Sequence, residues 1–116
     1  MPLIEINALP QPADVDVSKV VVELNREISG ALGCRLDAVW TVWRTMTGPY
    51  ARGEDLADQQ PRATHAPIVH VHLHRTPDET ARVVETIERV LVRELAVAPG
   101  NVFVTVQPVE ILERDG

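Results

Sequence analysis

The stretch Pro67-Ile68-Val69-His70-Val71-His72-Leu73-His74-Arg75-Thr76-Pro77-Asp78-Glu79 decides the fold. After Pro67 and Ile68, residues 69–74 alternate valine or leucine with histidine, which is the two-residue period of a β-strand. Thr76 then supplies an N-cap, Pro77 suits the first helical turn, and Glu79 completes a capping box. The stretch therefore predicts a strand followed almost at once by a helix.

The residues that follow extend this helix and add another strand. Apolar side chains at helical spacing predict a buried stripe, which comprises Val84, Ile87, Leu91 and Leu95. The β-rich run at residues 101–106 comes next. The second half of the chain thus predicts one βαβ unit.

The first half of the chain repeats this order. Residues 2–7 predict a strand, residues 17–32 a helix that stops at Gly33, and residues 38–43 another strand. The buried stripe of this helix is predicted to be Val17, Val21, Leu24, Ile28 and Leu32.

The two helices also agree position by position. One offset pairs Val20 with Val83, Val21 with Val84, Leu24 with Ile87, Arg26 with Arg89, Ile28 with Leu91, and Leu32 with Leu95. This agreement indicates a duplicated unit, with halves 2–46 and 67–108 inside a single domain over 1–116.

A tandem βαβ repeat predicts an α+β fold. Right-handed crossovers place both helices on one face of a four-stranded mixed sheet. The other face is expected to carry Leu3, Glu5, Asn7, His70, His72 and His74. Such a mixed surface suits a subunit interface, so we expect an oligomer.

Residues 47–66 predict a long loop between the halves, because they lack a sustained period and contain two glycines and two prolines. A loop of this length serves either as a functional cover or as a solvated connector. Tyr50, Arg52 and Arg62 are accordingly secondary candidates for substrate contact.

Composition narrows the class of protein. The chain has 116 residues, a net charge of −6 and four aromatic residues, which argues against nucleic-acid binding. No apolar run is long enough for a membrane span, and the start lacks the pattern of a signal peptide. Cys34 is the only cysteine, so no intrachain disulfide can form. We expect a cytoplasmic protein without a membrane partner.

The opening residues Met1-Pro2-Leu3-Ile4-Glu5-Ile6, the tandem βαβ order and Arg75 between a strand and a capped helix together resemble the tautomerase superfamily. The resemblance covers nearly the whole chain. The single-unit 4-oxalocrotonate tautomerases look like half of it. Malonate semialdehyde decarboxylase and the cis-3-chloroacrylic acid dehalogenases look like its full length. The resemblance implies a tautomerase/MIF-like fold, a homotrimer and catalysis without a cofactor or a metal.

The resemblance also implies the main site residues. Pro2, once Met1 is removed, would be the catalytic amine, and Arg75 would hold the substrate carboxylate. Pro67 is internal, so its nitrogen is an amide and one site per chain is expected. A reference α-amine has a pKa of about 7.7 to 8.0. Burial and the charge of Arg75 would both disfavour the protonated amine, which leaves a general base.

Further candidates surround this pair. Asp37 matches an aspartate of malonate semialdehyde decarboxylase, although an aspartate between a helix and a strand is also ordinary turn chemistry. Trp40 and Phe103 occupy equivalent places in the halves and would supply apolar walls. Trp40 aligns with the second substrate-binding arginine of 4-oxalocrotonate tautomerase, which disfavours a dicarboxylate substrate. Tyr50 and Arg52 complete the candidate substrate-binding set.

Three functions follow from these residues. The first is a tautomerase of a small 2-hydroxydienoate or 2-oxo acid, with Pro2 as the base. The second is a decarboxylase or hydratase of a 3-oxo or unsaturated acid, with protonated Pro2 as an acid. The third is a non-catalytic assembly module, which would follow if Met1 were retained, because the Pro2 nitrogen would then be an amide.

His70, His72 and His74 share one predicted strand face and would suit a metal. No acidic or cysteine ligand stands near them in the sequence. We therefore predict polar packing at the subunit interface, with sensitivity to pH.

Overall fold

The computed structural model describes residues 2–56 and 65–108. Its elements in chain order are β1 Leu3–Ala8, α1 Val17–Leu32, a 3₁₀ turn η1 Leu36–Ala38, β2 Trp40–Thr45, β3 Ala51–Arg52, β4 Asp55–Leu56, β5 Ile68–His72, α2 Pro77–Leu95 and β6 Phe103–Gln107. The predicted order of strands and helices is confirmed. The strands β2 and β6 begin two residues later than predicted.

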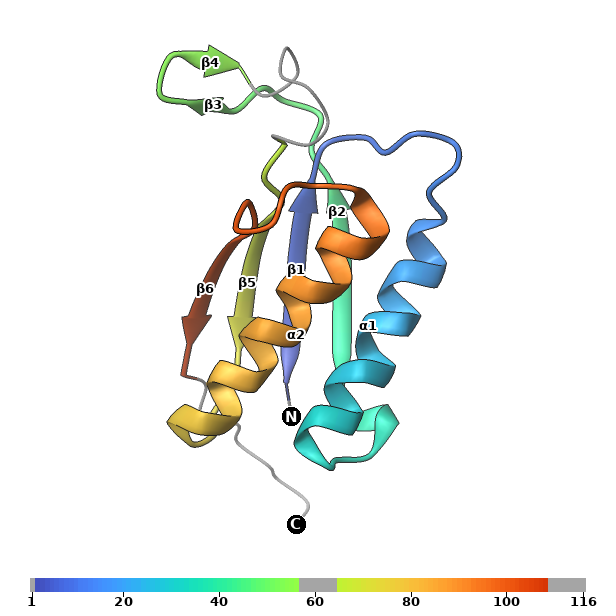
Figure 1. Cartoon of the computed structure of the whole chain (residues 1–116), viewed down its shortest axis with the longest axis vertical. Coiled ribbons are helices and arrows are strands. Elements are labelled where there is room, and N and C mark those ends of the chain that lie inside the picture. Colours follow the sequence, from blue (N-terminus) through green and yellow to red (C-terminus); the bar gives the residue numbers. More distant parts are fainter. Residues whose placement is uncertain (1, 57–64, 109–116) are drawn as a thin grey trace.

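The four long strands form one mixed sheet in the order β2-β1-β5-β6. The strands of each half are parallel, and β1 and β5 meet antiparallel at the centre. Both helices cover the same face of this sheet, so the other face is free of helices (Figure 1). The predicted α+β architecture of two βαβ units is confirmed.

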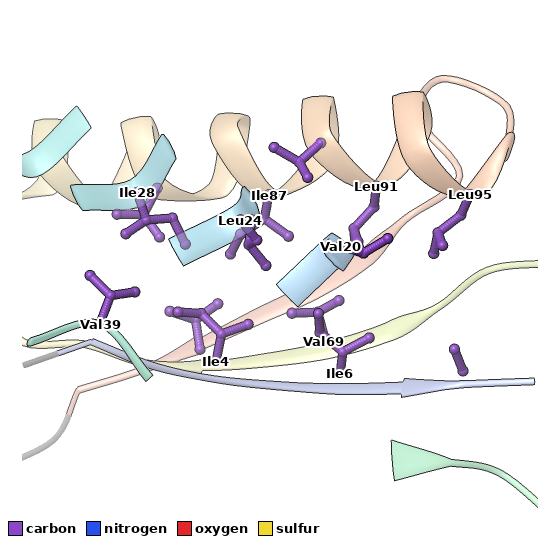
Figure 2. Close-up of a cluster of buried hydrophobic side chains, with 14 of the residues drawn as sticks. Ile4, Ile6, Val20, Leu24, Ile28, Val39, Val69, Ile87, Leu91 and Leu95 are labelled. Atoms are coloured by element: carbon purple, nitrogen blue, oxygen red, sulfur yellow. The ribbon is translucent and has the colours of Figure 1, made fainter. Parts of the chain in front are cut away.

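The core lies between the helices and the sheet. Figure 2 shows Leu24 and Ile28 of α1 beside Ile87 and Leu91 of α2, with Ile4, Ile6 and Val69 of the sheet facing them. All seven of these side chains are fully buried. Apolar burial of this kind is the main favourable contribution to folding.

The predicted helix stripes are partly wrong. On α1 the buried residues are Val20, Leu24 and Ile28, whereas Val17, Val21 and Leu32 are only partly buried. On α2 Val83 is fully buried and Val84 is not. Consecutive valines at 20–22 and 83–84 leave the rotation of each helix uncertain by one residue, and packing on the sheet settles it.

The ends of both helices are capped by residues close to them in the sequence. The predicted capping box of α2 is confirmed, since the Thr76 hydroxyl accepts from the Glu79 N–H at 3.2 Å and the Glu79 carboxylate accepts from Thr76. At its start α1 has Asp16, whose side chain accepts from the Lys19 N–H. Gly33 ends α1 at φ 65° in the left-handed region, as glycine allows.

The connector between the halves contains structure that its sequence did not predict. Strands β3 and β4 form a small hairpin beyond the sheet, at the end where β1 finishes (Figure 1). Residues 57–64, and with them the candidate Arg62, lie outside the described residues. Among the described residues, no helix is long and apolar enough to cross a membrane.

Candidate active site

The sheet has two ends with different side chains. At the Pro2 end β1 begins and β5 finishes, because Leu3 pairs with His72. At the Pro67 end β5 begins and β1 finishes, because Asn7 pairs with Ile68. The N-terminus and the β3–β4 hairpin accordingly lie at opposite ends in Figure 1.

Pro2 occupies a fixed position at the edge of the core. Its side chain is almost completely buried, and its carbonyl accepts a hydrogen bond from the Trp40 N–H at 3.0 Å. The parallel pairing of β1 with β2 continues from this bond. Met1, which determines whether the Pro2 nitrogen is an amine, lies outside the described residues.

Arg75 lies at the same end as Pro2, in the turn between β5 and α2. Its guanidinium Nη1 donates to Glu79 Oε2 at 3.4 Å, while Glu79 Oε1 accepts from the Thr76 hydroxyl at 3.0 Å. Hydrogen bonds from Thr76 are the main cause that lowers the pKa of Glu79. Arg75 is therefore held by a carboxylate that is itself fixed at the helix cap. Within the described part of the chain this long contact is its one side-chain hydrogen bond, so its other N–H groups are available there.

A hollow of about 520 Å³ opens beside Arg75. Its other lining residues include Leu73, His74, Pro77, Val106 and Pro108. Pro2 is not among them. The hollow thus combines apolar walls with one strong cation, which suits an organic acid with an apolar body.

Asp37 is also at the Pro2 end, on the 3₁₀ turn before β2. Its side chain is 69% exposed and forms two hydrogen bonds with Arg35, of 3.1 and 2.8 Å. This bidentate pair satisfies both carboxylate oxygens. Asp37 lies shortly before β2, and its side-chain hydrogen bonds within the described part of the chain go to Arg35 and not to Arg75.

Trp40 and Phe103 are both highly exposed, at 56% and 57%, and lie at opposite ends of the sheet. The Phe103 N–H donates to the Pro67 carbonyl at 3.1 Å, which repeats the bond between Trp40 and Pro2. Within one chain, therefore, Trp40 adjoins Pro2 and Phe103 does not.

Tyr50 and Arg52 accompany Phe103 at the Pro67 end, where all three line a hollow of about 270 Å³. Arg52 Nη1 donates to Asn101 Oδ1 at 2.7 Å, and the Tyr50 hydroxyl donates to the Ala66 carbonyl at 2.9 Å. The seven candidate residues thus divide into two groups. Pro2, Asp37, Trp40 and Arg75 lie at one end, and Tyr50, Arg52 and Phe103 lie at the other.

The helix-free face has a polar centre. His72 Nε2 lies 3.2 Å from Glu5 Oε2, Arg44 Nη2 lies 3.4 Å from Glu5 Oε1, and His70 Nδ1 lies 2.7 Å from Thr105 Oγ1. The hydrogen bond with His72 is the largest cause that lowers the pKa of Glu5, and Arg44 adds to it.

This network corrects two expectations about the histidines. An acidic residue does stand beside them, because β1 brings Glu5 to His72 from far away in the sequence. His74 lies beyond the end of β5 and is exposed. No group of three His, Cys, Asp or Glu side chains in residues 2–56 and 65–108 could hold a metal ion.

The sequence analysis missed the interactions of two site residues, Glu79 and Glu5. Glu79 was recognised as a helix cap but not as the partner of Arg75, although the i,i+4 spacing of an arginine and a glutamate was a usable signal. Glu5 was predicted to share the helix-free face with His72, but its pairing with His72 and Arg44 was missed, because these partners come from other strands.

No protein-family profile and no curated protein sequence matches this chain. Solved structures do match. A native fused 4-OT has a TM-score of 0.76 at 13% identity, covering 92% of this chain and 86% of its own. A macrophage migration inhibitory factor-like protein from Entamoeba histolytica has a TM-score of 0.70 at 12% identity, covering 93% and 88%.

A third similar structure is N1, a member of the cis-3-chloroacrylic acid dehalogenase family, with a TM-score of 0.66 at 14% identity. That match covers 92% of this chain and 74% of N1. Identities this low establish the fold and not the chemistry. The chain has the fold of the tautomerase superfamily.

Proposed function

We propose that this chain is a cofactor-independent tautomerase of a small 2-hydroxydienoate or 2-oxo acid. Pro2, freed of Met1, acts as the general base that moves a proton between two positions of the substrate. Arg75 binds the substrate carboxylate and stabilises charge that develops on the conjugated oxygen.

The observation that carries this proposal is that Pro2 and Arg75 lie at the same end of the sheet. The antiparallel pairing of β1 with β5 brings the start of β1 close to the turn between β5 and α2, which carries Arg75. Glu79 fixes Arg75, and the hollow beside it provides apolar walls. A single arginine, already in contact with Glu79 on one side, suits a monocarboxylate better than a dicarboxylate.

We infer that the chain works as a homotrimer, assembled through the helix-free face. Trp40, Val42 and Phe103 expose large apolar side chains on that face, which a monomer rarely leaves in water. Fused 4-OT has been solved as a trimer. In such an assembly Tyr50, Arg52 and Phe103 would reach a Pro2 site only from a neighbouring subunit.

Replacing Pro2 tests the proposal. Pro2→Ala exchanges the secondary amine of proline for a primary amine and should lower kcat/KM towards phenylenolpyruvate or 2-hydroxymuconate by up to about 10² to 10⁴, the usual contribution of general-base catalysis. Pro67→Ala is the matched control, since that nitrogen is an amide and has no proton to exchange. Intact mass should show that the active protein lacks Met1. Unchanged activity in Pro2→Ala would refute the proposal.

Asp37 supports a second candidate, the decarboxylase or hydratase reaction with protonated Pro2. It lies at the Pro2 end and on the turn that leads into β2. For this reaction Asp37→Asn should abolish turnover of malonate semialdehyde or of an acetylenic acid. For the tautomerase, the same substitution should change kcat/KM by less than about twofold, because Arg35 already occupies this carboxylate.

A further inference from the structure

The duplication gives the molecule two equivalent hollows. The hollow beside Arg75 is lined by Leu73, His74, Arg75 and Pro77, among others. A hollow of about 320 Å³ at the Pro67 end is lined by Ala8, Leu9, Pro10 and Pro12, among others. Each of these four residues stands 65 positions before its counterpart, the same spacing that separates Pro2 from Pro67.

The two hollows differ in charge. At the positions where the first hollow has Arg75 and His74, the second hollow has Pro10 and Leu9. Leu95, Val97 and other apolar side chains complete the walls, and none of the described residues that line this hollow is an arginine, lysine, aspartate or glutamate. An ionic ligand would lose its hydration there without gaining a partner.

Three polar side chains nevertheless line this apolar hollow, namely Gln11, Tyr50 and His65. The Gln11 amide already donates to the Leu9 carbonyl at 2.8 Å. His65 Nε2 is buried and has no hydrogen-bond partner among the described residues. The Tyr50 hydroxyl donates to the Ala66 carbonyl, so its oxygen can still accept a hydrogen bond. Burial raises the pKa of Tyr50, which keeps this hydroxyl neutral. A buried polar atom without a partner is unfavourable, and a ligand can satisfy it.

We propose that this hollow is a second binding site, which takes an uncharged ligand with a ring-sized apolar body and one hydroxyl or carbonyl group. That group pairs with His65 Nε2, and the apolar body displaces water from the walls made by Leu9, Leu95 and Val97. The site lies at the opposite end of the sheet from Pro2. It does not depend on the proposed tautomerase activity.

Three matched probes test the site in the full-length protein. Phenol is neutral with one hydroxyl, toluene has the same size without it, and benzoate adds a charge. In titrations followed by ¹H–¹⁵N NMR, the amides of Leu9, Leu95 and Val97 should shift with phenol. Phenol should bind about fivefold more tightly than toluene, the worth of one neutral hydrogen bond. Benzoate should produce no saturable shift of these amides.

His65→Phe should remove the preference for phenol while toluene still binds, and that retained binding shows that the hollow is intact. His65→Leu makes the same comparison with a smaller side chain, should the phenylalanine variant fail to fold. His74→Phe is the control, because His74 lines the other hollow, where it occupies the position equivalent to Leu9. This variant should keep the preference for phenol. Equal binding of phenol and toluene, or shifts confined to the amides around Arg75, would overturn the proposal.

Discussion

At the Pro2 end of the sheet the carbonyl of Pro2 accepts from the Trp40 N–H, and at the Pro67 end the carbonyl of Pro67 accepts from the Phe103 N–H. The turn beside the first carries Arg75, and the turn beside the second carries Pro10. One proline begins the chain once Met1 is removed, while the other is internal. The same backbone therefore carries an arginine at the turn of one end and a proline at the equivalent turn of the other, so the proposed acid–base chemistry is confined to the Pro2 end.

The difference shows how a duplicated fold becomes asymmetric. The core keeps the repeat, since Leu24 and Ile28 of α1 and their counterparts Ile87 and Leu91 of α2 are all fully buried. Core positions are constrained by close packing, whereas turn positions are free to change. Chemistry consequently diverges at the ends of the sheet and not in its middle.

The largest effect tests the symmetry of the core. Leu24→Ala and Ile87→Ala should each lower the free energy of unfolding by about 3 kcal/mol, because each leaves a cavity under a helix. Chemical denaturation at one fixed protomer concentration measures both, since assembly makes stability depend on concentration. Val22→Ala, at a side chain 45% exposed, is the control and should cost far less. A difference above about 2 kcal/mol between the first two would show that the halves are not equivalent.

The next effect tests the asymmetry of the ends. Arg75→Ala should lower kcat/KM by about 10- to 100-fold, the worth of a charge-assisted hydrogen bond to a carboxylate. Arg52→Ala, the matched arginine at the Pro67 end, should change it by less than about twofold. Steady-state kinetics with phenylenolpyruvate measures both. Equal losses would mean that both ends serve one substrate across a subunit boundary.

Local sequence chemistry predicted the parts of this fold that local interactions determine. The bounds of α1 and the capping box at Thr76 follow from residues a few positions apart. The duplication identified the two βαβ units, because the offset pairs Leu24 with Ile87. The rotation of each helix about its axis could not be predicted, because runs of valine are compatible with more than one buried stripe. Tertiary packing alone determines which valine faces the sheet.

The candidate site was harder, because residues distant in the sequence compose it. Pro2 and Arg75 were chosen together by resemblance, and the pairing of β1 with β5 brings both to one end of the sheet. Their catalytic roles stay a prediction. Phe103 was expected to wall the Pro2 site, yet the pairing of β5 with β6 carries it to the other end. Equivalence in a repeat implies equivalent surroundings, and it does not imply proximity.

A smaller effect concerns the helix ends, which the repeat also pairs. Gly33 and Ala96 both end a helix in the left-handed region, at φ 65° and φ 55°. Ala96→Gly should raise the free energy of unfolding by about 0.5 to 1 kcal/mol, because relief of backbone strain exceeds the added entropy of the unfolded chain. Gly33→Ala should lower it by a similar amount, although space for a methyl group exists there. Thermal unfolding measures both, and changes of the same sign would contradict this account.

The smallest effect lies midway between the ends, where Glu5 meets His72 and Arg44. The pKa of Glu5 is lowered in the folded protein, so its contribution to stability is present above the unfolded value of about 4.5 and is lost as the pH falls through the lower folded value.

Wild-type protein should therefore lose more thermal stability between about pH 5 and pH 3 than Glu5→Gln does, by on the order of 1–2 °C in Tm. Glu23→Gln, at a half-buried helix glutamate paired with Arg26, is the control and should follow the wild type. Coincident curves for wild type and Glu5→Gln would contradict the prediction. Repeating the comparison at tenfold higher protein concentration tests the assembly as well, because a trimer built on this face would shield the pair from solvent and enlarge the difference.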